Sequence, residues 1–227
     1  MSKDHLYKIA LEQMPKPPVE IVPNSQRWDV IDGLTDRNNL GIELGVAAGS
    51  FSSRMVQSGK FRRFWGVDVY SDIHDITEYK RALVTVGIEA DYSLLRMTFD
   101  EALDLFPDEF FDFIYVDGYA HTGEEGGRTL INWYAKLKPG GIFAGDDYDF
   151  EKWPLVVWAV NDLANQLGVM LNITDQVANV AYNKFRSWYF TRPMTAPDSP
   201  LRYCEPLVEV GDVEKLLRAA ARRKSQR

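Results

Sequence analysis

The stretch that decides the fold is Asn39–Ser50, which reads NLGIELGVAAGS. It predicts a short buried strand over residues 40–44, a turn bracketed by Gly45 and Gly49, and a helix capped by Ser50. A strand, a glycine turn and a helix in this order open nucleotide-binding α/β domains. Because glycine has no Cβ, the two glycines let the backbone approach a ligand closely.

The turn differs from the dinucleotide fingerprint, whose glycines are spaced GxGxxG. Here the spacing is GxxxG, and Glu43 lies two residues before Gly45. A carboxylate beside the turn suits a cationic amino-acid ligand and disfavours a pyrophosphate. The alternative interpretation is an ordinary buried strand followed by a turn.

These residues resemble motif I of the class I S-adenosylmethionine-dependent methyltransferases, and the form with a leading glutamate looks closest to their small-molecule O-methyltransferases. The resemblance implies S-adenosylmethionine as the cofactor. It also implies that this stretch supplies the cofactor contacts Glu43, Gly45, Val46, Gly49 and Ser50.

Composition limits the possible classes of protein. The chain has 227 residues, enough for one α/β domain, and a net charge of -7, which argues against a general nucleic-acid binder. Cys204 is the single cysteine, so there is no internal disulfide. We find no secretory signal and no apolar run long enough for a membrane span. We therefore expect a cytoplasmic protein with no membrane or nucleic-acid partner.

Strand and helix patterns alternate through the middle of the chain and predict a doubly wound, Rossmann-like α/β sheet. Three short strands after residue 168 follow each other too closely for helical crossovers, so the mostly parallel sheet should have an antiparallel end. We expect an N-terminal arm over residues 1–26, the main domain over 27–192, and a loop and helix over 193–227. A helix is predicted for Ser25–Arg37 at the start of the domain.

Asp68 lies at the end of the predicted second strand, Phe61–Val69, about 20 residues past the glycine turn. A carboxylate at this position commonly accepts the ribose hydroxyls of an adenosine ligand; the alternative is a simple turn former. Asp72 and His74 follow in a polar loop that could face the site. By resemblance, the adenine ring would lie at the corner after the third strand, which contains Met97, Thr98 and Phe99.

Three carboxylates follow the fourth and fifth strands, namely Asp117, Asp146 and Asp147. Neighbouring parallel strands end at the same edge of a sheet, so these groups should lie close together and repel each other. A hard divalent cation such as Mg²⁺ would remove that conflict. The alternative is that Asp146 and Asp147 only form a turn.

Residues 27–192 also resemble the metal-dependent O-methyltransferases of antibiotic and sugar tailoring, and the cephalosporin-hydroxylase-like group. The resemblance rests on VDG at residues 116–118, LKPGG at 137–141 and GDDY at 145–148. It implies that Asp117, Asp146 and Asp147 bind Mg²⁺. Relatives place another acid or a differently spaced histidine after the position of Asp117. This chain has His121 there, our expected general base, with Tyr119 in reserve.

The function expected is therefore metal-assisted methyl transfer from S-adenosylmethionine to a hydroxyl of a small molecule, such as a sugar or natural product. Tyr148 and Trp153 are candidates for the acceptor pocket. The alternatives are an NAD-dependent oxidoreductase and a catalytically inactive cofactor-binding scaffold on the same fold. Aromatic residues at Trp188 and Tyr189, together with the arm, favour a homo-oligomer.

Overall fold

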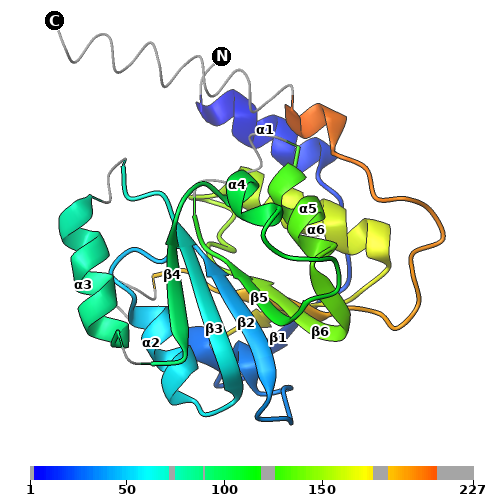
Figure 1. Ribbon diagram of the computed structural model, residues 1–227. Helices are drawn as coiled ribbons and strands as arrows, with labels where there is room; N and C mark the ends of the chain where they lie inside the picture. The colour runs from blue at the N-terminus through cyan, green and yellow to red at the C-terminus, as the bar shows by residue number, and fades with distance from the viewer. Residues whose placement is uncertain (1–2, 72–74, 89, 119–125, 176–183, 209–227) are drawn as a thin grey trace, which may run out of the picture.

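A computed structural model describes residues 3–71, 75–88, 90–118, 126–175 and 184–208, with the side chains of residues 3–7 excepted. These residues form one eight-stranded sheet with helices on both faces (Figure 1). The strand order is β1-β7-β8-β6-β5-β2-β3-β4, and the central strands β5 and β2 carry the ends on which the candidate site is built.

The strands are β1 (Val19–Val22), β2 (Asn39–Leu44), β3 (Phe61–Asp68), β4 (Tyr92–Arg96), β5 (Phe111–Val116), β6 (Leu137–Gly145), β7 (Leu171–Thr174) and β8 (Trp188–Thr191). The α-helices are α1 (Lys3–Gln13), α2 (Ser50–Gln57), α3 (Ile76–Val86), α4 (Phe99–Leu103), α5 (Arg128–Tyr134) and α6 (Pro154–Leu167). A 3-10 helix, η1 (Arg27–Ile31), precedes β2.

The strand directions confirm the predicted Rossmann-like sheet. The pairs from β4 through β6 are parallel, and β8 is antiparallel to both β6 and β7. An unexpected strand, β1, adds to the far edge of the sheet by pairing in parallel with β7. The segment predicted as an arm therefore contributes a strand to the sheet of the main domain.

Strand β5 is buried on both faces, as its continuous apolar sequence predicts. Ile114 and Val116 join the core on the side of α4, α5 and α6, whereas Phe113 and Tyr115 join the core beneath α2 and η1. This double cover makes the end of β5 a rigid support for Asp117, which follows it directly.

Several predicted boundaries need correction. The helix expected for Ser25–Arg37 is only the five-residue η1. Gly49, in the left-handed region at φ +82°, occupies the cap of α2, so Ser50 is the first helical residue and not the cap. The LKPGG segment, residues 137–141, forms the first part of β6, and the pairing of β6 with β5 shifts register between Phe111 and Phe113.

Two further predictions, a strand at 177–183 and a helix at 210–223, lie outside the described residues. Within the described part of the chain, no helix combines the length and the apolar character that crossing a membrane requires.

Candidate functional site

The glycine turn is closed tightly against the neighbouring strand end. Gly45 has φ +96°, and a Cβ on it would lie 1.4 Å from the carbonyl oxygen of Asp117. The Gly45 N–H donates to the carbonyl oxygen of Val67 at 2.9 Å, which continues the ladder between β2 and β3. Only glycine satisfies both the backbone conformation and the space, so the turn brings the ends of β2, β3 and β5 together.

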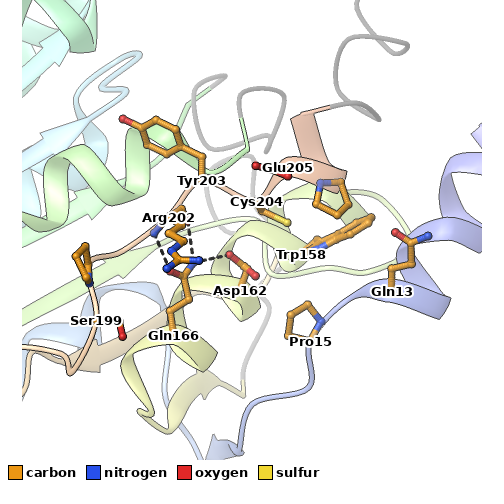
Figure 2. A pocket seen from close by; sticks show the side chains of 12 residues that line it. Gln13, Pro15, Trp158, Asp162, Gln166, Ser199, Arg202, Tyr203, Cys204 and Glu205 are labelled. Carbon is orange, nitrogen blue, oxygen red and sulfur yellow. Dashed lines mark hydrogen bonds between the residues drawn. The ribbon is translucent and has the colours of Figure 1, made fainter.

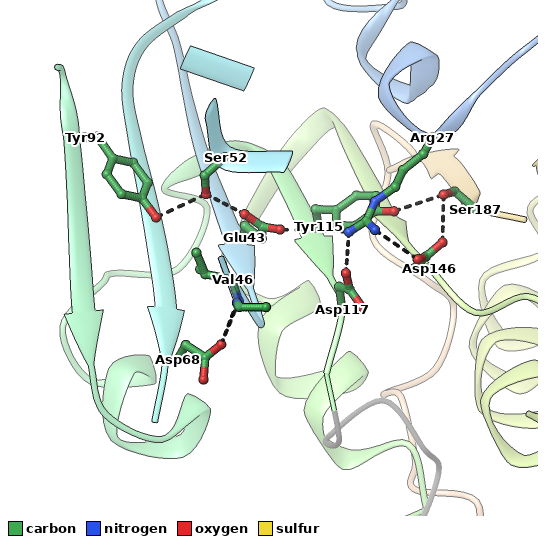
Figure 3. Close-up of polar contacts among 11 residues, drawn as sticks. Arg27, Glu43, Val46, Ser52, Asp68, Tyr92, Tyr115, Asp117, Asp146 and Ser187 are labelled. Atoms are coloured by element: carbon green, nitrogen blue, oxygen red, sulfur yellow. Dashed lines mark hydrogen bonds and ion pairs between the residues drawn. The ribbon is translucent and has the colours of Figure 1, made fainter. Parts of the chain in front are cut away.

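Asp68 lies beside the turn, as predicted. Its Oδ2 accepts hydrogen bonds of 2.9 Å from the N–H groups of both Val46 and Ala47 (Figure 3). Its Oδ1 lies 3.4 Å from the Tyr70 N–H, a long hydrogen bond. The side chain is buried, so the turn fixes the orientation of a carboxylate at the position where a ribose is expected.

Glu43 is buried at the end of β2 and faces the interior of the site. The Ser52 hydroxyl donates to Glu43 Oε2 and lies 3.1 Å from the Tyr92 hydroxyl. Burial raises the pKa of Glu43 to about 8, although the positive charge of Arg27 acts in the opposite direction. Burial therefore favours the protonated form of Glu43, whereas the neighbouring guanidinium favours the carboxylate.

Arg27 lies among the carboxylates and was missed by the sequence analysis. Its two terminal nitrogens pair with Asp117 and, at 3.2 Å, with Asp146, and Glu43 Oε1 lies 4.0 Å away (Figure 3). The guanidinium carbon is 5.0 Å from the Phe51 ring centroid and 5.1 Å from that of Tyr115. We refer to Arg27, Glu43, Asp117 and Asp146 as the Arg27 cluster.

Asp146 is held by two further groups. Ser187 on the segment before β8 donates from Oγ to Asp146 Oδ1 at 3.1 Å, and the Tyr115 hydroxyl lies 2.9 Å from the same serine oxygen. Burial raises the pKa of Asp146 to about 7; Arg27 lowers it and Asp117 raises it further. The predicted convergence of Asp117 and Asp146 is therefore observed, but a guanidinium lies between them.

The magnesium prediction is not supported by this arrangement. Among the described residues, no group of three or more His, Cys, Asp or Glu side chains is placed to hold a metal ion. Asp117 and Asp146 are both paired with Arg27, and Asp147 has φ +61° in a turn. The donor set does not fit a divalent cation, because the guanidinium already occupies the space that the two carboxylates share.

The predicted adenine corner has the expected local structure. Thr98 caps α4, and its capping box with Glu101 is complete. Met97 and Phe99 are partly buried against the core. A Cβ on Gly118 would lie 3.1 Å from the Phe99 ring, so this ring adjoins the end of β5. Contact with a cofactor at this corner stays a prediction.

The acceptor side is less completely described. His121, Tyr119, Asp72 and His74 lie outside the described residues. The Tyr148 hydroxyl donates to Asn161 on α6 at 2.8 Å, and the same asparagine donates to the Pro15 carbonyl at 3.0 Å. The Trp153 ring meets Phe185 edge to face. Tyr148 therefore has a structural role in fixing the arm to α6, whether or not it also borders the acceptor.

A separate cavity of about 610 Å³ lies between the end of α1, the outer face of α6 and the segment 199–206 (Figure 2). Trp158, Asp162, Gln166, Tyr203 and Cys204 are among its lining residues. It shares no residue with the glycine turn or the Arg27 cluster, and neither Tyr148 nor Trp153 lines it.

Comparison with known proteins agrees with this geometry. Residues 40–148 match a family model described as a methyltransferase domain. The matched segment begins in β2 and ends just after the Asp146–Asp147 pair, so it contains the glycine turn, Asp68, Asp117 and Asp146 but not Arg27. The sequence matches no curated protein significantly.

Solved structures show the same fold at low sequence identity. A Thermotoga maritima spermidine synthase is 12% identical with a TM-score of 0.57, covering 86% of this chain and 73% of its own. The Aquifex aeolicus tRNA (m1A58) methyltransferase TrmI is 13% identical with a TM-score of 0.56, covering 84% and 76%. A Streptococcus thermophilus rRNA methylase is 19% identical with a TM-score of 0.50, covering 73% and 93%.

Other matches are partial. One of them is a chain from the complex between the Haloferax volcanii Trm112 methyltransferase activator and a putative methyltransferase. This match is 20% identical with a TM-score of 0.40, and it covers 63% of this chain and 51% of that chain. At such identities, structural likeness indicates the fold and not the reaction. The strand order and the crowded glycine turn agree with the match of residues 40–148 to a methyltransferase domain, a segment that makes up slightly less than half of the chain.

Proposed function

We propose that this protein transfers a methyl group from S-adenosylmethionine to a hydroxyl of a small molecule. The observation that carries the proposal is the glycine turn, whose Gly45 leaves no room for a Cβ against the Asp117 carbonyl and which has a buried carboxylate on each side. Glu43 and Asp68 belong to those two sides, and both suit the cationic and hydroxyl-bearing parts of this cofactor.

The residues around the glycine turn provide groups that would hold each part of the cofactor. The amino-acid end would face the Arg27 cluster, where carboxylates receive an ammonium group and the guanidinium receives a carboxylate. Asp68 would accept the ribose hydroxyls, and Met97 with Phe99 would border the adenine. Bound in this way, S-adenosylmethionine supplies an already activated methyl group.

The protein has to place a nucleophile in line with that methyl group and receive its proton. His121 remains our proposed base and Tyr119 the reserve, since both follow directly after β5 in the sequence. A reference pKa of about 6.5 makes histidine suitable for this role near neutral pH. We derive no step through a metal ion, because the described carboxylates do not fit one.

Charge supports a small acceptor over a nucleic acid. The net charge of the chain is -7, and the Arg27 cluster places three carboxyl groups against one guanidinium. A polyanion would be repelled by such a site unless a basic surface compensated. A neutral or cationic small molecule, such as a sugar or natural product, is compatible with it.

The test is calorimetric titration of the full chain with S-adenosylmethionine, S-adenosylhomocysteine and NAD. We expect both adenosyl ligands to bind and NAD not to bind. Asp68→Asn should weaken S-adenosylmethionine binding about 10- to 100-fold, because a buried hydrogen bond to a charged group contributes roughly 1.5–3 kcal/mol.

The matched control is Asp112→Asn. Asp112 is another partly buried carboxylate that accepts a backbone N–H, from Leu40 at 2.8 Å, and pairs with Lys138. It is the second residue of β5, at the opposite end of the strand from Asp117, so this variant should lose stability without losing cofactor affinity. Binding of NAD, or no binding of either adenosyl ligand, would overturn the proposal and favour the oxidoreductase or another chemistry.

A further inference from the structure

The Arg27 cluster combines a buried cation with carboxylates from three strand ends. Glu43 lies at the end of β2, Asp117 follows β5 and Asp146 follows β6. We propose that the Arg27 guanidinium is the built-in cation of this site and takes the position of the divalent metal that the sequence analysis predicted. A consequence, which rests on the proposed function, is that the domain binds its cofactor without a metal.

The geometry of the Arg27 ion pairs supports this proposal. Arg27 uses one terminal nitrogen for Asp117 and the other for Asp146, so the planar group bridges two carboxylates that would otherwise repel each other. Its side chain is only 7% exposed, and an arginine remains charged under these conditions. A single guanidinium therefore supplies the charge neutralisation for which a metal was expected.

The groups that surround the Arg27 guanidinium also support it. The guanidinium lies near the Phe51 ring, 5.0 Å from its centroid, and near the Tyr115 ring at 5.1 Å. Aromatic rings favour a weakly hydrated, planar cation. Mg²⁺ instead requires near-octahedral oxygen ligands and retains several waters. The walls of this site suit an arginine better than a hydrated metal ion.

Hydrogen bonds on both sides of Arg27 in the chain fix its position. The preceding segment is fixed to the far edge of the sheet, since Ser25 Oγ donates to the Val22 carbonyl at 2.6 Å and the Asp175 N–H donates to Ser25 Oγ at 3.2 Å. Downstream, η1 is closed by a hydrogen bond of 2.7 Å from the Gln26 N–H to the Asp29 carboxylate. Both flanks hold the backbone of Arg27 in place, so its guanidinium is a fixed part of the site.

The experiment measures metal binding and stability directly, so it does not depend on an acceptor. Wild-type protein is dialysed against EDTA and then titrated with Mg²⁺ and Mn²⁺ by calorimetry. Its Tm is also recorded with and without each metal at about 5 mM, a concentration high enough to fill weak sites. We expect no saturable site and a Tm unchanged by metal. Affinity for S-adenosylmethionine should be the same in Mg²⁺ and in EDTA.

Arg27→Met removes the charge and keeps much of the side-chain volume. We expect its Tm to fall by roughly 10 °C, as for other broken buried ion pairs in domains of this size. The vacated position lies between carboxylates, so Mg²⁺ or Mn²⁺ should now raise its Tm by several degrees. Arg27→Lys retains the charge and should recover part of the loss without any metal.

Arg192→Met is the matched control. Arg192 also pairs with a carboxylate, Glu109 at 2.8 Å, and lies 5.0 Å from an aromatic ring centroid, that of Tyr134, but outside the cluster. This variant should lose stability and gain no response to metal. If Arg27→Met does not fold, the Arg27→Lys and wild-type arms still decide the question.

Two results would overturn the inference. One is a saturable metal site in wild-type protein that disappears in Asp146→Asn. The other is an Arg27→Lys variant no more stable than Arg27→Met, which would mean that packing and not charge is what Arg27 contributes. If neither adenosyl ligand bound, the proposed function would fail, whereas the metal and stability results would still stand.

Discussion

Asp68 and Asp146 are two buried carboxylates at the same edge of one sheet, yet different groups satisfy them. Asp68 accepts two backbone N–H groups from the glycine turn, 22 and 21 residues earlier in the chain. Asp146 pairs with the guanidinium of Arg27 and accepts the hydroxyl of Ser187. Asp68 therefore accepts hydrogen bonds from main-chain N–H groups, which every residue except proline provides. Asp146 instead depends on side chains, which a substitution can remove.

The difference affects how each half of the site can change. A backbone N–H survives almost any substitution, so the Asp68 side depends on the conformation of the turn. The Asp146 side depends on the identity of individual residues. Four substitutions test this contrast, from the largest expected effect to the smallest.

Gly45→Ala should have the largest effect, because its Cβ would overlap the Asp117 carbonyl and the backbone is left-handed. We expect a loss of more than about 4 kcal/mol in the free energy of unfolding, together with loss of cofactor binding. Gly87→Ala is the control: its φ of +97° is nearly the same, but a Cβ there would meet no atom within 4 Å. That variant should lose about 1–3 kcal/mol in urea unfolding, the cost of the backbone conformation alone. Equal losses would show that conformation alone, and not the close approach, makes Gly45 necessary.

Glu43→Gln tests the charged half through pH. The folded-state pKa of Glu43 is about 8 against an ordinary value of 4.5, so the folded protein holds this proton more tightly than the unfolded chain. The resulting stabilisation is fully present below pH 4.5 and is lost as the pH rises through about 8. We expect the unfolding free energy of wild type to fall across this range by about 3 kcal/mol more than that of Glu43→Gln.

The measurement is urea unfolding of both proteins at pH 5, 6, 7 and 8. Asp146 contributes to the slope in both, because its pKa of about 7 is also raised. Parallel profiles for the two proteins would contradict the assignment of a raised pKa to Glu43.

Ser187→Ala removes one hydroxyl that serves both Asp146 and Tyr115. Both partners are buried, so we expect a loss of about 1–2 kcal/mol in thermal or urea unfolding. Cofactor affinity measured by calorimetry should change less than threefold, since Arg27 still holds Asp146. A larger loss of affinity would mean that Asp146 depends on this hydroxyl for its position.

Asp108→Ala should have the smallest effect. Asp108 pairs with Lys136 at 2.8 Å, but its side chain is 70% exposed. Solvent and salt screen such a pair, so the unfolding free energy should change by less than about 0.5 kcal/mol. A change above 1 kcal/mol would show that ion pairs on this surface matter as much as the buried cluster.

The contrast also explains what could be predicted from the sequence. The glycine turn and Asp68 occur where the pattern placed them, the turn directly after β2 and the carboxylate at the end of β3. Helix α6 begins at Pro154 and is followed by Gly168, two residue types that mark helix boundaries in a sequence. The parallel sheet with its antiparallel end follows from the spacing of strands and helices.

Arg27 could not be placed in the same way, because it precedes Asp117 by 90 residues and no local pattern joins them. The sequence did show that converging carboxylates need a positive charge, and a metal was the simplest source. The signal that could have corrected this is the arginine in RWDVI, a short and otherwise largely apolar segment that precedes β2 by seven residues. Strand β1 was missed for a related reason: its four residues pair with β7 near the other end of the described chain.

That pairing has a consequence for the order of assembly during synthesis. Residues 19–22 can complete the sheet only after residues 171–174 have been made. Contacts so distant in sequence form late in folding, because a large loop must close before they contribute. Arg27 follows β1 closely, so its guanidinium reaches its final position only when most of the domain is already in place. The buried cation can therefore join Asp117 and Asp146 only after the chain has been synthesised past both carboxylates.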